Sequence, residues 1–297
     1  MTTAPALDPD TPSNWGRWGD DDELGTLNFI TGAARARGVA EARDGRTVSL
    51  AFPVTPVPLA GPVPFGVSPM PAGILQLMNF TGSPANALTD VLVVNTHHGS
   101  LTHIDALAHV PTAGQVYPGI GIERAVAAGT VKRGSTAAFS AGIVTRGVFL
   151  DLAPGDRLAA GTWVNAGDLE AAERRVNTRV ESGDALVVRG GWTQVAGLTE
   201  PIPAMTPDAV RWMADREVSV YAGDIGDRPP FLLPPNAVLA MHQIALGQLG
   251  MPLVDCVEVE ALATTCQDLS RHSFLFVVAP IAVTGATGVP VNPLAIF

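Results

Sequence analysis

The chain has 297 residues, a formal net charge of −10, and 47% hydrophobic against 15% charged residues. This composition excludes an intrinsically disordered chain, which combines low hydrophobicity with high charge. The 18 Lys and Arg residues are scattered, so nucleic acid and anionic membrane surfaces are not expected partners. So few charges leave apolar surface uncovered, and we therefore expect a homodimer or homotetramer.

The ends of the chain and its cysteines indicate a cytoplasmic protein. Residues 1–14 are rich in Pro, Asp and Thr and are expected to form a mobile arm, followed by one domain over residues 15–297. No basic region followed by an apolar run marks a signal peptide, and the two cysteines form no disulfide ladder or C-x-x-C motif. The longest apolar stretch, residues 274–283, is about half the length that crosses a bilayer.

Apolar periodicity and turn signals predict alternating strands and helices. Pro and Gly crowd residues 53–73, which predicts a long functional loop. No dinucleotide-binding or Walker motif is present, and we expect a single α/β domain with a mixed sheet. In chain order the predicted elements are a helix over 31–43 capped by Thr31, strands over 47–54, 91–96 (buried) and 147–152, a helix from Asn165 or Asp168 to 177, a strand over 184–189, a helix over 206–217, a strand over 218–222, a helix over 236–249 and a strand over 273–283.

Four of the six histidines fall within residues 97–109, together with one aspartate. His103 and Asp105 stand two apart and face the same way on an extended segment. His98 reaches the same point if Gly99 allows the chain to turn back, and His97 is the alternative first ligand. His109 follows Asp105 by four residues, so a helical turn would bring it over the same place.

Imidazole and carboxylate ligands suit Zn, Mn or Fe(II) better than Ca or Mg. A divalent metal activates water at neutral pH and polarises a carbonyl, and His109 could accept or deliver a proton. Such a site cleaves an amide, a cyclic amide or an ester or lactone, and no G-x-S-x-G nucleophile motif is present.

The histidine segment resembles the His-x-Gly-Thr-His-x-Asp-x-x-x-His signature of the cyclase family of metal-dependent hydrolases, which includes bacterial kynurenine formamidase and isatin hydrolase. Further similar segments are Gly-Thr-Leu-Asn at 25–28, Arg-Gly-Val-Phe-Leu-Asp at 146–151, the segment 183–192, Gly-Asp at 223–224, and the later His242 and Asp255. The resemblance implies a swivelling β/β/α fold with a partly barrel-like sheet. It also implies metal ligation by His98, His103 and Asp105, a second metal at His242 and Asp255, and proton transfer by His109.

Two departures from that signature bear on the metal. His98 and His103 are five apart where the family's shorter signature has four, which keeps His97 open as the first ligand. Asp255 stands where the family has Glu, so one or two metal ions, Zn or Mn, are expected per chain.

The substrate is expected to be a small apolar or aromatic molecule. Trp18, Phe65 and Trp192 are the predicted pocket residues. The alternatives are a metal-dependent lyase, dehydratase or cyclase acting on a natural-product intermediate, and a non-catalytic metal- or ligand-binding protein.

Overall fold

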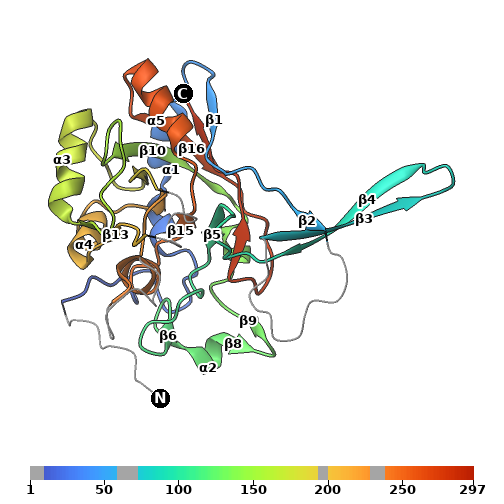
Figure 1. Ribbon diagram of the computed structural model, residues 1–297. Coiled ribbons are helices and arrows are strands. Elements are labelled where there is room, and N and C mark those ends of the chain that lie inside the picture. The colour runs from blue at the N-terminus through green and yellow to red at the C-terminus, as the bar shows by residue number, and fades with distance from the viewer. Residues whose placement is uncertain (1–9, 59–72, 193–199, 228–237) are drawn as a thin grey trace.

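A mixed sheet of nine strands forms the centre of the computed structural model, which describes residues 10–58, 73–192, 200–227 and 238–297 (Figure 1). Four neighbouring strands run parallel, and the strands on either side of them are antiparallel, so the sheet is mixed as predicted. In spatial order the strands are β1 (Thr47–Ser49), β18 (Leu294–Ile296), β16 (Ser273–Val278), β10 (Ile143–Asp151), β12 (Ala185–Arg189), β14 (Val220–Gly223), β15 (Leu253–Asp255), β5 (His103–Asp105) and β17 (Gly288–Pro290).

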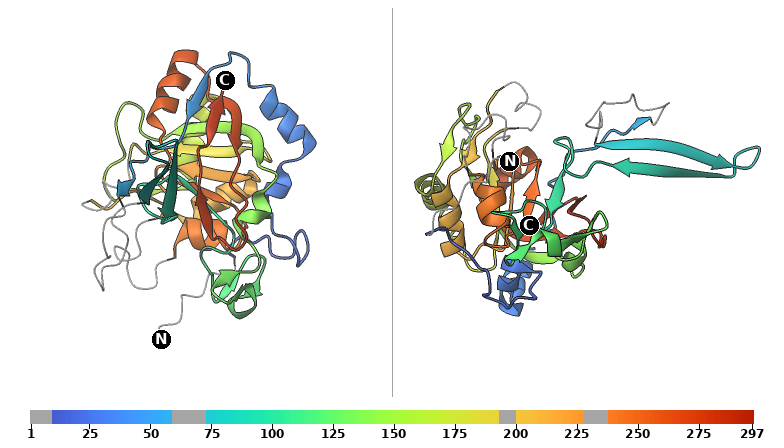
Figure 2. Two further views of the ribbon diagram at one scale, coloured as in Figure 1. Left: turned by 90° about the vertical axis from the view of Figure 1, so that its right-hand side faces the viewer. Right: turned by 90° about the horizontal axis from the view of Figure 1, so that it is seen from below.

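Helices cover this curled sheet (Figure 2). α1 (Gly32–Val39) packs on β10 and β16, and α3 (Ala166–Val176) packs on β10 and on α4 (Pro207–Asp215). The remaining helices are α2 (Ile122–Ala125), α5 (Glu260–Leu269), two 3-10 helices (Gly25–Phe29 and Thr136–Phe139) and a π-helix (Ala240–Leu246). No helix in the described ranges is long and apolar enough to span a membrane.

Local sequence signals account for the helix starts. The Thr31 hydroxyl accepts a hydrogen bond from the backbone N–H of Ala34, as expected of a cap. For α3 the alternative starts resolve to Asn165, which forms a capping box with Asp168. Several predicted bounds need correction, since the helix at 31–43 shortens to α1 and the strand at 273–283 shortens to β16. The strand at 47–54 shortens to β1, and the helix at 236–249 is the π-helix, with Gly247 N–H donating to the His242 carbonyl five residues back.

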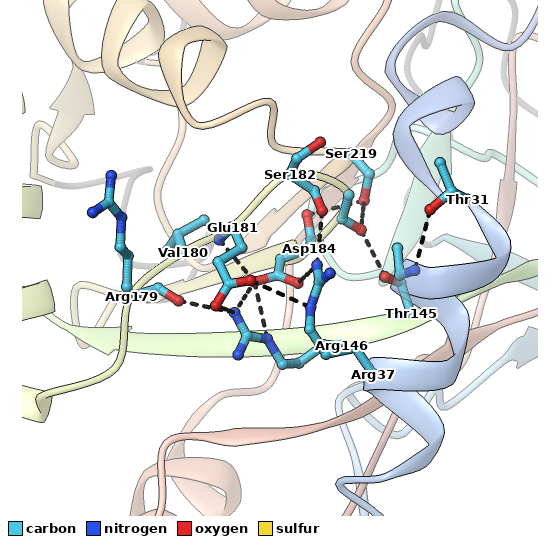
Figure 3. A network of polar contacts seen from close by, with 12 residues as sticks. Thr31, Arg37, Thr145, Arg146, Arg179, Val180, Glu181, Ser182, Asp184 and Ser219 are labelled. Carbon is cyan, nitrogen blue, oxygen red and sulfur yellow. Dashed lines mark hydrogen bonds and ion pairs between the residues drawn. The ribbon is translucent and has the colours of Figure 1, made fainter.

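A buried network of ion pairs connects α1 to the sheet (Figure 3). Asp184 is fully buried and accepts hydrogen bonds from Arg37 and from Arg146 on β10. Thr145 and Ser219 both donate to the Gly183 carbonyl beside it. Because every charge in this group is paired, we assign it a structural role.

Outside the main sheet, β3 (Ile74–Thr81) and β4 (Ala87–Val94) form a long antiparallel hairpin, called here the arm. It projects away from the body in Figure 1 and in the right-hand view of Figure 2, and β2 (Val57–Pro58) pairs at its base. The prediction of a buried strand at 91–96 is therefore wrong about burial, because every residue of β4 is exposed. The other two-stranded pairs are β6 (Gln115–Val116) with β7 (Ile120–Gly121), β8 (Val126–Ala127) with β9 (Thr130–Val131), and β11 (Trp163–Val164) with β13 (Ala204–Met205).

The N-terminal segment, residues 1–14, was predicted to be mobile, and residues 1–9 of it lie outside the described ranges. Asn14 is buried, and its side chain donates to the Leu249 carbonyl. Trp15 donates through Nε1 to the Gly247 carbonyl. From residue 14 onward the chain therefore packs against the end of the π-helix.

Candidate metal centre

The candidate metal centre surrounds Asp105, the last residue of β5. Its side chain is fully buried, and four histidine nitrogens lie within 4.0 Å of its oxygens. His97 Nδ1 lies 3.0 Å and His103 Nε2 lies 3.5 Å from Oδ1, while His242 Nε2 lies 3.5 Å from Oδ2. His109 Nε2 is 4.0 Å from Oδ2. The predicted partnership of His103 and Asp105 on one extended segment is seen here, since both side chains of β5 point to one place.

The sheet places the other ligand candidates beside these residues. β15 pairs with β5 so that Asp255 lies opposite His103, and β17 lies on the other edge of β5. Asp255 Oδ2 is 3.5 Å from His242 Nε2. The chain turns after β5, with His109 N–H donating to the Ala106 carbonyl, and this turn returns His109 to Asp105.

His97, His103 and His242 each offer one ring nitrogen to the centre while a neighbour holds the other. His103 Nδ1 donates to the Leu101 carbonyl at 2.8 Å, which leaves the Nε2 lone pair toward Asp105. His97 Nε2 lies 3.1 Å from the Thr287 hydroxyl, which leaves Nδ1. This arrangement is typical of metal-ligating histidines, whose second nitrogen is fixed by an outer partner.

His242 is held the same way by a residue that the sequence analysis did not single out. Asp227 Oδ2 lies 2.9 Å from His242 Nδ1, and the same carboxylate accepts from the backbone N–H groups of Met241 and His242. Asp227 therefore caps the π-helix and orients its imidazole at once. Neither Asp227 nor Thr287 has a spacing signal in the sequence that could have revealed it, because both reach the site through tertiary contacts.

The structure brings His97 into the cluster and not His98. The His98 ring turns back on its own segment, where Nδ1 lies 2.8 Å from the Ser100 hydroxyl. His97 stacks on His109 with ring centroids 3.7 Å apart, inside the group. Gly288 makes this approach possible, since a Cβ there would lie 2.7 Å from His97 Cε1. Two sets of ligand atoms result, His97 with His103 and Asp105, and Asp105 with His109 and His242.

Three polar atoms at the centre make no hydrogen bond within the described ranges, and a bound cation would satisfy them. Both Asp105 oxygens and His97 Nδ1 are buried and make no hydrogen bond with any residue in the described ranges. A buried carboxylate in this state is costly unless it is paired with a cation. The donor set of imidazole nitrogens and carboxylate oxygens fits Zn, Mn or Fe(II). These residues therefore fit a divalent metal.

The pKa shifts of Asp105 and His109 also favour a bound cation. Burial alone would raise the pKa of Asp105, but close contacts with His242 and His97, together with the charges of His109 and His103, lower it well below its usual range. Burial lowers the pKa of His109 to about 4, with Asp105 opposing and His97 and His242 adding to the shift. At neutral pH the centre thus holds an ionised carboxylate beside a neutral His109 imidazole.

The predicted pocket residues lie apart from this cluster or outside the described part of the chain. Trp192 is buried, donates through Nε1 to the Leu158 carbonyl, and is covered by the Arg157 guanidinium. It lines a surface pocket of about 420 Å³ that contains none of the clustered residues. Trp18 packs edge-on against Phe29. Phe65 lies outside the described ranges, and contact of these residues with substrate stays a prediction.

Comparisons with known proteins bear on the family and the fold. Residues 31–227 match the Cyclase family model, whose description is "Putative cyclase". A crystal structure described as a novel cyclase is 25% identical, with a TM-score of 0.81 over 98% of this chain and 100% of that one. Comparison with curated protein sequences finds no match.

Isatin hydrolases share the fold at lower identity. Isatin hydrolase A from Labrenzia aggregata, bound to benzyl benzoate, is 16% identical with a TM-score of 0.61, over 84% of this chain and 93% of that one. The enzyme from Ralstonia solanacearum is 20% identical with a TM-score of 0.58, over 89% and 95%. The family match spans about two thirds of the sequence and ends at Asp227, the residue that holds His242. The chain therefore belongs to the cyclase family.

Proposed function

We propose that the chain is a metal-dependent hydrolase that cleaves an amide, a cyclic amide or a lactone of a small apolar or aromatic substrate. The observation that carries this proposal is Asp105, fully buried and without a hydrogen-bond partner in the described ranges, with histidine nitrogens aimed at both of its oxygens. Isatin hydrolases, which share the fold, make a cyclic aromatic amide the first substrate class to test.

His97, His103 and Asp105 would hold the first metal, Zn or Mn. His242 and Asp255 would hold a second metal, since His242 Nε2 lies 3.5 Å from Asp255 Oδ2 and 3.5 Å from Asp105 Oδ2. A divalent metal bound here supplies an activated water and polarises the substrate carbonyl. Outer partners lock the rings of His97, His103 and His242, so these side chains would hold a bound metal in a fixed position.

His109 is the proton carrier in this proposal. Its imidazole is neutral at pH 7, the form that accepts a proton, and its Nε2 lies 4.0 Å from Asp105 Oδ2. A proton taken by His109 would be stabilised by this carboxylate and could then pass to the leaving nitrogen or oxygen. The stacked His97 ring holds the His109 plane in place.

Both cysteines of the chain, Cys256 and Cys266, are buried and unbridged, which suits the reducing cytoplasm proposed for this enzyme. Self-association as a dimer or tetramer also belongs to the proposal.

The test begins with elemental analysis of the protein purified without chelator, counting metal per chain. One metal supports a site at His97, His103 and Asp105, and two bring in His242 and Asp255. Turnover of an N-formyl aromatic amine and of isatin is then measured with chelated and reloaded enzyme in ¹⁸O-labelled water. We expect one labelled oxygen in the product, and turnover without label would contradict hydrolysis in favour of a lyase.

A further inference from the structure

Residues 13–26, called here the N-terminal strap, cross the turn that ends the π-helix. We propose that Asn14 and Trp15 of this strap are positioning residues for the half of the metal centre formed by His242 and Asp255. The inference rests on the proposed function, since this half-site has a role only if it holds a metal.

The strap supplies hydrogen-bond donors to the turn at residues 247–250. Carbonyls at the end of a helix find no partner within that helix. Here four consecutive carbonyls accept from a segment at least 224 residues earlier in the chain. The pairs are Trp15 Nε1 with Gly247 at 2.9 Å, the Asn14 N–H with Gln248 at 3.0 Å, Asn14 Nδ2 with Leu249 at 2.9 Å, and the Thr26 N–H with Gly250 at 2.9 Å.

Close packing also fixes the strap against this turn. A side chain at Gly25 would collide with the Gly250 carbonyl. Tyr117 lies against Gly250 as well, where an added Cβ would be 2.6 Å from the ring carbon Cε2. The Tyr117 hydroxyl in turn donates to Asp22 of the strap at 2.9 Å. The turn therefore cannot shift without disturbing the strap.

The turn lies between two candidate metal ligands. His242 stands five residues before it, and Asp255 stands five residues after it. The sheet fixes Asp255, because β15 pairs with β14 on one side and with β5 on the other. The π-helix belongs to no sheet, so the position of His242 depends on what holds the two ends of that helix.

Asp227 holds the start of the π-helix and the strap holds its end. Asp227 accepts from the backbone N–H groups of Met241 and His242. At the other end, Trp15 donates to the Gly247 carbonyl, and the Gly247 N–H donates to the His242 carbonyl at 3.1 Å. A single residue therefore connects the Trp15 indole to the backbone of the ligand.

The geometry of the half-site makes it sensitive to this support. His242 Nε2 lies 3.5 Å from Asp255 Oδ2, and a ligand set has to be held within about 0.5 Å of its productive geometry. Helix ends that lose their contacts open locally, which would spread the positions of the imidazole. No hydrogen bond of the strap within the described ranges reaches the other ligand set, which consists of His97, His103 and Asp105.

The test measures stepwise Zn²⁺ binding by the metal-free, full-length protein in competition with a chromogenic chelator. Asn14→Ala removes the Nδ2 donor to the Leu249 carbonyl. Asn28→Ala is the matched control, because Asn28 Nδ2 donates to the Gly25 carbonyl at 3.0 Å and not to the turn. Trp15→Phe is an independent variant that keeps an aromatic ring without the Nε1 donor.

We expect Asn14→Ala and Trp15→Phe each to weaken one of two Zn²⁺ binding steps by at least about fivefold and to leave the other step unchanged. Amide hydrogen exchange over residues 242–251 of the metal-free protein should be faster in both variants. Asn28→Ala should match the unaltered protein in both measurements.

Equal weakening of both steps, or two unchanged steps in Asn14→Ala and Trp15→Phe, would overturn the inference. The same loss in Asn28→Ala would overturn it too. One Zn²⁺ per unaltered chain would contradict the inference but not the first proposed site, whereas no Zn²⁺ at all would contradict the proposed function itself. Circular dichroism establishes that each variant is folded, and Trp15→Phe decides the question if Asn14→Ala is not.

Discussion

The arm and the strand that follows it show opposite uses of β-structure. β4, with the sequence ALTDVLVV, is rich in aliphatic residues yet exposed along its whole length. β5, only three residues long and two of them polar, is fully buried between β15 and β17. Both are extended, and fewer than ten residues separate them. An apolar sequence therefore predicts a strand, but the neighbours of that strand decide its burial.

The same contrast explains where the chemistry lies. A buried strand holds polar side chains in place because its neighbours fix them on both sides, as they do His103 and Asp105. On the arm, a polar residue such as Asp90 makes only a local contact with Gln76. The predictions below test whether this difference in setting has the expected consequences.

The largest difference should come from neutralising one aspartate in each region, Asp105 in the metal centre and Asp90 on the arm. Asp105→Asn deletes the buried carboxylate that both candidate ligand sets share, and we expect loss of bound metal and a fall in turnover of at least about a thousandfold. Asp90→Asn on the arm is the matched control and should retain both. Elemental analysis and initial rates measure the outcome, and a fully loaded, active Asp105→Asn protein would contradict the proposed centre.

His97 and His98 both lie between the arm and β5, and only His97 reaches the cluster around Asp105. His97→Ala removes a ring nitrogen 3.0 Å from Asp105 and should weaken metal affinity by at least about a hundredfold. His98→Ala removes a ring that contacts Ser100, and its metal affinity should stay unchanged. Competition with a chromogenic chelator measures both. Equal weakening in the two variants would show that both histidines face the metal.

Apolar truncations should separate the regions by stability. Ile104, on β5, is fully buried, so Ile104→Ala should lower the free energy of unfolding by about 2–5 kcal/mol. Leu92 is 53% exposed, and Leu92→Ala should lower it by less than about 1 kcal/mol at concentrations where the chain is monomeric. Urea unfolding of both variants decides this, and similar losses would mean that the arm packs on the body.

A second buried carboxylate, Asp224, can be compared with Asp105 within the body of the molecule. Asp224, unlike Asp105, is satisfied by the backbone N–H groups of Gly190 and Trp192. Burial raises the pKa of Asp224 to about 6, against the opposing effect of these hydrogen bonds. Its own titration, rather than a bound cation, should therefore be visible in stability.

The raised pKa of Asp224 determines whether its contribution to the free energy of unfolding rises or falls with pH. Between pH 4 and 6 the folded chain keeps the Asp224 proton while the unfolded chain releases it, so this contribution to stability is complete below about pH 4 and is lost as pH rises through 6. The loss should be about 1–3 kcal/mol. Urea unfolding at several pH values should show this decline in the unaltered protein and a flatter profile in Asp224→Asn, and parallel profiles would contradict the raised pKa.

The sequence by itself determined the family, the mixed α/β fold and the segment that carries the site. These follow from local patterns: the alternation of His103 and Asp105, a helix start at Asn165 or Asp168, and the apolar runs of β10 and β12. Each depends on residues close together in the chain, and such signals are readable without neighbours.

Only the tertiary structure decided which histidine joins the cluster, what holds His242, and that β4 is exposed. His97 enters because Gly288, almost two hundred residues later, leaves room for its ring. Asp227 holds His242 on the π-helix, fifteen residues later in the chain, and the sequence has no spacing rule for such a contact. Burial and ligand choice are set by contacts between distant segments, and local pattern carries no record of those contacts.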